Sequence, residues 1–213
     1  MNLIVCYTVF IVWLLLLLIN AIRYFTCLPK TRINKTLTLY LIASAFEGVF
    51  CFTLGFLNPN DNFYLSHIFF SIQLSFLSLF YYTLFQDKKA KQYVKYAAIS
   101  VFLMSMLQYL IVPSSFWQFN LLEIVSVSCL LISFGLIHLY NSMGEDKIYF
   151  YFSLGMIMYF FCSCIIYLSG QFTLVFLKDP YIDQWVIKDL FFIVYQILIW
   201  KELKMLIKNN NDW

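Results

Sequence analysis

The chain has 213 residues, of which 62% are hydrophobic and 12% are charged, and its formal net charge is +3. A soluble domain is about 45–50% apolar and about 25% charged. This composition excludes a water-soluble globule, because there is too little polar surface to coat one. The basic residues lie between long apolar stretches, so the small positive charge indicates membrane topology rather than binding to nucleic acid.

Seven apolar segments follow one another along the chain. Each is close to the ~20 residues that a helix needs to cross ~30 Å of hydrocarbon. None shows the short alternating strands of a transmembrane barrel. The sequence therefore predicts an all-α membrane protein, residues 1–213 forming a single bundle of seven transmembrane helices with short loops. The expected spans are 3–22, 37–57, 63–85, 94–112, 118–140, 148–169 and 185–207.

The loops predict an orientation. Most of the 14 basic residues fall on one side of the expected bundle, in the segments 23–35 and 87–95 and in the tail after Trp200. Basic loops face the cytoplasm. We therefore expect the N-terminus outside and the C-terminus inside, which requires an odd number of spans.

Aromatic residues near the ends of the spans agree with this orientation. Tyr109 and Trp117 fall at expected outer ends, and Tyr24, Tyr81 and Tyr149 fall at expected inner ends. Tyrosine and tryptophan are enriched where a membrane meets water. The pattern predicts two aromatic belts facing the lipid headgroups.

Polar residues in the middle of the spans indicate a possible site. Glu47 lies near the centre of the second span, where a carboxylate costs about 2.5 kcal/mol or more unless it is paired, protonated or hydrated. Gln73 and Gln196 lie at a similar depth in their own spans, Ser44 adjoins Glu47, and Ser75 belongs to a serine stripe beside Gln73. We expect these five residues to form a ligand or ion pocket at the membrane midplane. Hydrogen bonds that only join helices are the alternative.

A second acid lies nearer the membrane surface. Glu123 is about one turn inside the outer end of the fifth span, and Ser126 follows it on the same helix face. The pair is expected to mark the mouth of an outer cavity, unless Glu123 simply reaches up to water. His67 and His138 lie near the ends of their spans and are expected to be interface residues without a special role.

Motifs that would identify an enzyme or a metal site are absent from the sequence. There is no H-E-x-x-H and no G-x-S-x-G. The six cysteines are scattered, with no C-x-x-C and no histidine at metal-ligand spacing. The sequence predicts no cofactor and no metal, and it favours a non-enzymatic protein while leaving catalysis open.

Seven short-looped helices with this orientation resemble the membrane input modules of some bacterial sensor kinases and other small seven-helix bacterial membrane proteins. The resemblance covers the whole chain at the level of topology. It implies a sensory or accessory subunit in a bacterial inner (cytoplasmic) membrane. Expected partners are the lipid bilayer and either a membrane or cytoplasmic protein or further copies of the chain, but not nucleic acid.

Two other functions remain open on the sequence alone. The midplane polar groups could line the path of a small transporter or of a homo-oligomeric channel, so transport stands beside signalling. Alternatively, Glu47 and Glu123 could be the acid and base of a lipid-modifying membrane enzyme.

Overall fold

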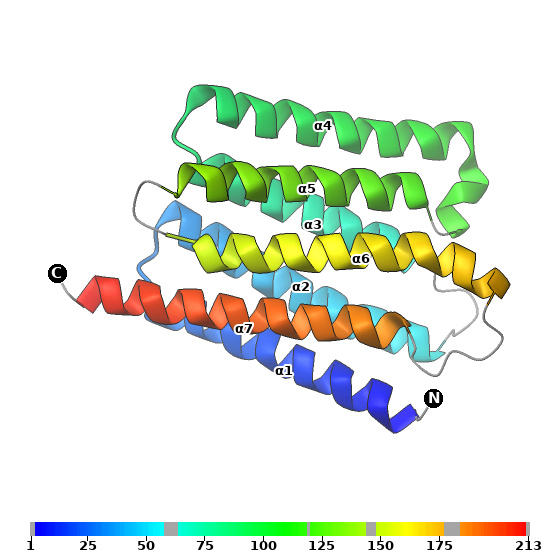
Figure 1. Cartoon of the computed structure of the whole chain (residues 1–213), viewed down its shortest axis with the longest axis horizontal. Coiled ribbons are helices and arrows are strands. Elements are labelled where there is room, and N and C mark those ends of the chain that lie inside the picture. Colours follow the sequence, from blue (N-terminus) through cyan, green and yellow to red (C-terminus); the bar gives the residue numbers. More distant parts are fainter. Residues whose placement is uncertain (1–2, 58–63, 119, 144–147, 177–183, 212–213) are drawn as a thin grey trace. The chain divides into compact units, whose positions relative to one another are not determined.

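A computed structural model describes residues 3–57, 64–118, 120–143, 148–176 and 184–211, and all regular structure within these ranges is helical (Figure 1). By length and composition, α1 to α6 could each cross a membrane. The predicted all-helical, membrane-type fold is thereby confirmed. The helices are α1 (Leu3–Cys27), α2 (Arg32–Leu57), α3 (Leu65–Leu84), α4 (Lys88–Ile111), the short 3-10 helix η1 (Pro113–Trp117), α5 (Leu121–Asn141), α6 (Phe150–Phe176) and α7 (Gln184–Asn211).

In the described part of the chain, α7 is not among these six helices, and charged residues lie toward both of its ends. Lys188 and Asp189 lie near its start, and Lys201 and Glu202 follow in its last third. The uncharged stretch between Asp189 and Lys201 is shorter than the ~20 residues that a spanning helix needs. The helix α7 is nevertheless the longest of the described helices. Its charged residues, and not its length, therefore distinguish it from the six helices that could cross a membrane.

Several helices continue past the apolar segments from which they were predicted. The helix α4 begins at Lys88 rather than at 94, because Asp87 caps it: the Asp87 carboxylate accepts a hydrogen bond from the Ala90 N–H at 3.0 Å. Lysine is also a good helix former. The basic segment expected to be a loop therefore forms about the first two turns of the helix.

Contacts divide the chain into two units. Unit 1 contains residues 1–28 and 135–213, and unit 2 contains residues 29–134. The second boundary falls inside α5, between Phe134 and Gly135.

In unit 1, α1 and α7 run parallel. The ring of Trp13 packs on Phe192 at 5.0 Å, and further along both helices Asn20 donates to the side-chain oxygen of Gln196 at 3.0 Å. One turn later the Tyr24 hydroxyl donates to the carbonyl of Ile199 at 3.3 Å. Because residue numbers rise together on both helices, the start of α1 and the end of α7 lie at opposite ends of unit 1.

The helix α6 runs antiparallel to α7 and is capped by it. The Glu202 side chain is fully buried, and its two oxygens accept from the backbone N–H groups of Tyr149 and Tyr151 at 2.5 and 2.8 Å. The first N–H groups of a helix have no partner within the helix and attract negative charge. Glu202 therefore closes the start of α6 from a distant part of the sequence. At this junction the backbone of Tyr149 has a φ of 60°, a left-handed conformation that residues other than glycine rarely adopt.

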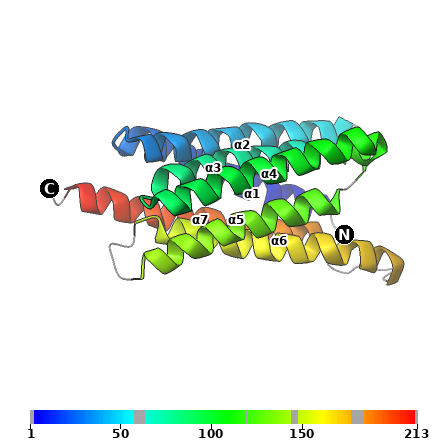
Figure 2. The same ribbon diagram turned by 90° about the horizontal axis from the view of Figure 1, so that it is seen from above.

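Unit 2 is built around α3, which packs against α2 and α4 (Figure 1, Figure 2). The buried face of α3 includes Phe70, Leu77 and Phe80. Contacts of α5 set its direction: the ring of Phe134 lies 6.0 Å from Tyr81 and 5.7 Å from Tyr93. The start of α5 therefore lies with the start of α3 and the end of α4.

The interpretation of the inner tyrosines as a lipid-facing belt is wrong for three of them. Tyr24, Tyr81 and Tyr149 are 1%, 0% and 4% exposed. A tyrosine near a helix end can also turn inward, because its hydroxyl finds a carbonyl there, as that of Tyr24 does.

The close contact of α6 with α7 yields a prediction about Gly155. A Cβ atom at Gly155 would lie 2.9 Å from the Tyr195 ring and 3.2 Å from the Leu198 Cβ. We expect Gly155→Val to lower the free energy of unfolding in detergent by about 1–3 kcal/mol, the usual effect of overpacking. Met158→Val, at an exposed position on the same helix, is the control and should change stability little. Equal stability of both variants would contradict the close packing of α6 on α7.

Candidate functional site

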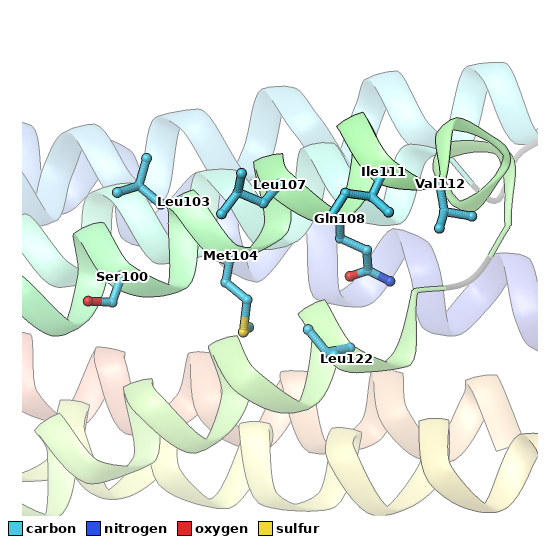
Figure 3. A pocket seen from close by; sticks show the side chains of 8 residues that line it. All are labelled: Ser100, Leu103, Met104, Leu107, Gln108, Ile111, Val112 and Leu122. Atoms are coloured by element: carbon cyan, nitrogen blue, oxygen red, sulfur yellow. The ribbon is translucent and has the colours of Figure 1, made fainter.

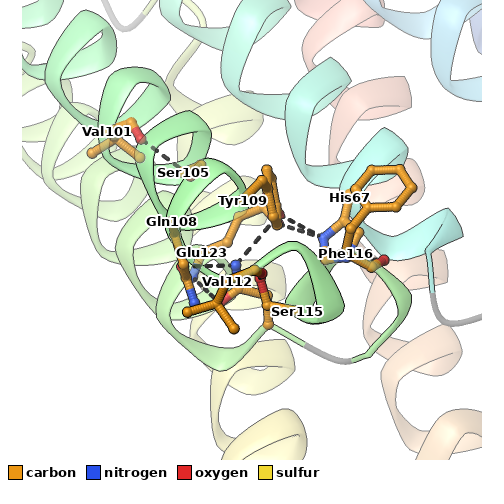
Figure 4. A network of polar contacts seen from close by, with 10 residues as sticks. His67, Val101, Ser105, Gln108, Tyr109, Val112, Ser115, Phe116 and Glu123 are labelled. Carbon is orange, nitrogen blue, oxygen red and sulfur yellow. Dashed lines mark hydrogen bonds and ion pairs between the residues drawn. The ribbon is translucent and has the colours of Figure 1, made fainter.

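The starts of α3 and α5 and the end of α4 meet at one end of unit 2, where each contributes a titratable side chain. These are His67, Glu123 and Tyr109, which Figure 4 shows pointing toward one another. His67 and Glu123 are only 4% and 3% exposed. We call these three residues, together with Asn120 and Gln108, the His67 cluster.

The three titratable side chains form a closed set of hydrogen bonds. His67 Nδ1 lies 2.6 Å from Glu123 Oε2 and 2.9 Å from the Tyr109 hydroxyl, which also donates to Glu123 Oε2. On its other side, His67 Nε2 lies 3.0 Å from the carbonyl oxygen of Phe116, in η1. The Phe116 ring stacks on the imidazole at 5.3 Å.

These contacts determine how many protons the pair holds. A carbonyl oxygen can only accept, so His67 Nε2 carries a hydrogen and donates it to Phe116. A second proton must lie between Nδ1 and Glu123 Oε2, because two lone pairs 2.6 Å apart would repel each other. Whether that proton resides on nitrogen or on oxygen, the pair is neutral overall. Neutrality is what permits two ionisable groups to be buried together.

Two amide side chains extend the cluster. Asn120 caps the start of α5, since its side-chain oxygen accepts from the Glu123 N–H at 3.3 Å. Its Nδ2 donates to Gln108 Oε1 at 2.8 Å and lies 3.4 Å from the Tyr109 hydroxyl. The capping bond thus holds Glu123 in place, while the amide links Tyr109 to Gln108.

A groove opens beside Gln108, and Figure 3 shows the side chains that line it. Its volume is about 450 Å³, and all but two of its lining residues are apolar. Gln108 lies near one end of this lining. The groove is formed by Ser100, Leu103, Met104, Leu107, Gln108, Ile111, Val112 and Leu122.

The helix α4, which supplies most of the groove, is weakly held along its length. Only Val94 and Ser105 are buried among its residues. Polar contacts hold it near both ends: Tyr93 lies 3.1 Å from the Ser133 hydroxyl, and Tyr109 joins the His67 cluster. A helix with few buried contacts has low local stability.

The two residues predicted at the cavity mouth behave differently. Glu123 is buried and bonded, so the alternative in which it reaches up to water is wrong. Ser126 is half-buried and takes no part in the described bonds of the His67 cluster.

The sequence interpretation missed His67, which was expected to be an interface residue. A signal did exist, because His67, Tyr109 and Glu123 each lie within about a turn of the same predicted membrane face.

The predicted midplane residues on α2 and α3 are mostly buried. Gln73 accepts a hydrogen bond from the Tyr40 hydroxyl at 2.9 Å, and Ser44 lies one turn beyond Tyr40. The Ser44 hydroxyl and Gln73 Nε2 are buried and lack a hydrogen-bond partner among the described residues. Glu47 is 6% exposed and accepts from the Cys51 thiol at 2.9 Å. Ser75, in contrast, is exposed and does not share the buried face of Gln73.

Gln196 belongs to unit 1, where its partner is Asn20. Asn20 Nδ2 donates to the Gln196 backbone carbonyl at 2.9 Å and to its side-chain oxygen at 3.0 Å. His138, expected at an interface, is buried and lies 2.9 Å from the Ser153 hydroxyl. Both residues join helices within unit 1.

Among the residues with described positions, no group of three or more histidine, cysteine, aspartate or glutamate side chains could hold a metal ion. Comparison of the chain with protein-family models, with curated proteins and with solved structures gives no match.

The shared proton leads to a prediction for Glu123. Glu123→Ala should lower the free energy of unfolding in detergent by about 1–3 kcal/mol, because it removes the carboxyl group to which the buried His67 and the Tyr109 hydroxyl are bonded. In a double-mutant cycle with His67→Ala, the two effects should fall short of additive by about 0.5–3 kcal/mol. Ser126→Ala, one turn further along α5, is the control and should be close to neutral. Strictly additive effects would show that His67 and Glu123 do not share a proton.

Proposed function

We propose that this chain is a non-enzymatic integral membrane protein, a sensory or accessory subunit, and that its α4–α5 groove takes up an amphiphile from the membrane. Gln108 carries the proposal: its side-chain oxygen is occupied by Asn120, while the residue lines an apolar groove. An amide N–H in apolar surroundings favours a ligand that brings an oxygen acceptor. A long alkyl chain with a carboxylate or carbonyl head has both features.

The response would run through the His67 cluster. A ligand bonded to Gln108 acts on Asn120, which contacts Tyr109 and caps the helix that carries Glu123. Since α4 is held mainly at its ends, a change at Tyr109 would shift α4 relative to α3. Such a shift is the kind of small helix displacement by which interfaces switch.

Catalysis is less well supported by the same contacts. Both nitrogens of His67 are engaged, Nε2 with Phe116 and Nδ1 with Glu123 and Tyr109. A general base needs a nitrogen within reach of the substrate's proton. His67 would have to break this set of bonds first, so the geometry favours binding over reaction.

Transport by a small transporter or homo-oligomeric channel is the second candidate. The buried Ser44 hydroxyl and Gln73 Nε2 lack partners in the described part of unit 2, and Glu47 lies one turn from Ser44 on the same helix. Unsatisfied polar groups inside a membrane helix pair favour a polar ligand or ion. This observation supports the midplane pocket rather than the groove.

The cellular setting is proposed from topology. We infer seven spans, with α7 the seventh, an N-out/C-in orientation and a bacterial inner membrane. Support comes from the basic segments and from the parallel direction of α1 and α7 in unit 1. A membrane or cytoplasmic protein, or another copy of the chain, would receive the signal.

The orientation can be tested with reporter fusions. Alkaline phosphatase, which is active outside the cytoplasm, should be active when fused before Met1 and inactive when fused after Trp213. A fluorescent protein that folds only in the cytoplasm should give the opposite result. The same compartment for both termini would contradict the seven-span arrangement.

The groove can be tested with a diazirine-bearing palmitic acid as the probe. After photolysis, labelled peptides from the purified protein should map to α4 and the start of α5. Gln108→Leu should reduce this labelling about tenfold, the loss expected when one hydrogen bond to a charged group is removed.

Gln118→Leu is the matched control, because Gln118 is exposed near the same end of unit 2 but does not line the groove. Its labelling should stay at the parent level. Uniform labelling of all exposed helices, or equal loss in both variants, would show that the groove does not recognise the carboxylate.

A further inference from the structure

Exposed cations lie over aromatic rings at the end of unit 1 where α1 ends and the last third of α7 begins. The Arg23 guanidinium, near the end of α1, lies 4.2 Å from the centre of the Trp200 ring on α7. Lys204, one turn further along α7, places its ammonium 5.7 Å from the same ring. The bonds from Asn20 and Tyr24 to α7 fix the two helices in the register that brings Arg23 to Trp200.

A third cation belongs to the same surface. The Lys201 ammonium lies 3.9 Å from the centre of the Tyr151 ring, at the start of α6. Arg23, Lys201 and Lys204 are all exposed, and no carboxylate pairs with any of them among the residues whose contacts are described. We call this set, with Trp200 and Tyr151, the cationic surface.

The acid that adjoins these cations in sequence cannot neutralise them. In the sequence, Glu202 directly follows Lys201 and precedes Lys204 by two residues. Its side chain is nevertheless fully buried and caps α6. Within the described residues, no carboxylate therefore pairs with the positive charge at this surface. A cation over an aromatic face is stabilised by the ring, but it keeps N–H donors for another acceptor.

Apolar side chains continue from the cationic surface along α1. Ile22 is 62% exposed, and Ile19 and Leu15 follow at 40% and 53%, one turn apart. In a membrane this row faces acyl chains. A ligand with a phosphate group and two alkyl tails would meet the cations with its head and this row with its tails.

We propose that the cationic surface of unit 1 binds anionic phospholipids, with the phosphate at Arg23 and Lys204 and the tails along the exposed row of α1. Guanidinium binds phosphate with directed, charge-assisted hydrogen bonds. Each basic residue near an anionic membrane surface contributes about 1 kcal/mol. Trp200 and Tyr151 suit this position, because aromatic rings favour the level of the headgroups. The proposal is independent of the α4–α5 groove, which lies in unit 2.

The test uses full-length protein in detergent and two lipids with identical tails, dioleoyl phosphatidylglycerol and dioleoyl phosphatidylcholine, with bound lipid counted by native mass spectrometry. The parent protein should retain the anionic lipid in clear preference to the zwitterionic one. Arg23→Gln combined with Lys204→Gln should weaken phosphatidylglycerol binding about thirtyfold, from two basic residues at about 1 kcal/mol each.

The matched control removes the same charge elsewhere: Lys88→Gln combined with Lys89→Gln, two exposed residues at the start of α4, should change binding less than about threefold. Lys204→Gln alone keeps the contact of Arg23 with Trp200 and should weaken binding about fivefold; it decides the matter if the double variant fails to fold.

Three outcomes would overturn the proposal. One is equal retention of both lipids by the parent protein. Another is equal loss in the α1/α7 variants and in the α4 control, which would indicate general charge attraction. The third is displacement of phosphatidylglycerol by millimolar inorganic phosphate, which would show a phosphate site without a role for the tails.

Discussion

A carboxyl group and an imidazole can be buried together in an apolar helix bundle when they share a proton, and unit 2 depends on such a pair. His67 Nε2 donates its hydrogen to the Phe116 carbonyl. The one further proton, between Nδ1 and Glu123, makes the pair of His67 and Glu123 neutral overall. Tyr109 ties the end of α4 to the same pair. Without the His67–Glu123 pair, the start of α3, the end of α4 and the start of α5 would each carry a polar group in need of a partner, and α4 would lose the bonds of Tyr109 to α3 and α5.

Unit 1 meets the same constraint with different groups. Its helices are joined by an amide pair, Asn20 and Gln196, and by a carboxylate that caps a helix from a distance. Lipid tails are as apolar as the side chains that face them, so apolar burial alone provides little drive for helices to associate in a membrane. Polar contacts and close packing at positions such as Gly155 supply the specificity that the hydrophobic effect cannot.

The placement of charge follows from these contacts as well. Glu202 is turned inward to complete α6, while Lys201 and Lys204 lie over Tyr151 and Trp200 and form no ion pair with an acid of the described residues. In the same way, Asn120 uses the Gln108 oxygen and leaves the Gln108 amide N–H for the groove. In the two binding roles that we propose, a structural bond on one side of a residue leaves a polar or charged group available on the neighbouring surface.

The sequence by itself determined the helical membrane class and the approximate extent of each helix, because these depend on local composition and on the thickness of a bilayer. It did not determine which polar residues meet. Depth along a helix is readable from residue spacing, but rotation about the helix axis and the choice of neighbours are set by packing. Hence Gln196, matched in depth to Gln73, pairs with Asn20 in unit 1, and Ser75 is exposed. His67, Tyr109 and Glu123, from three separate helices, become one proton-sharing cluster only where tertiary structure brings the helix ends together.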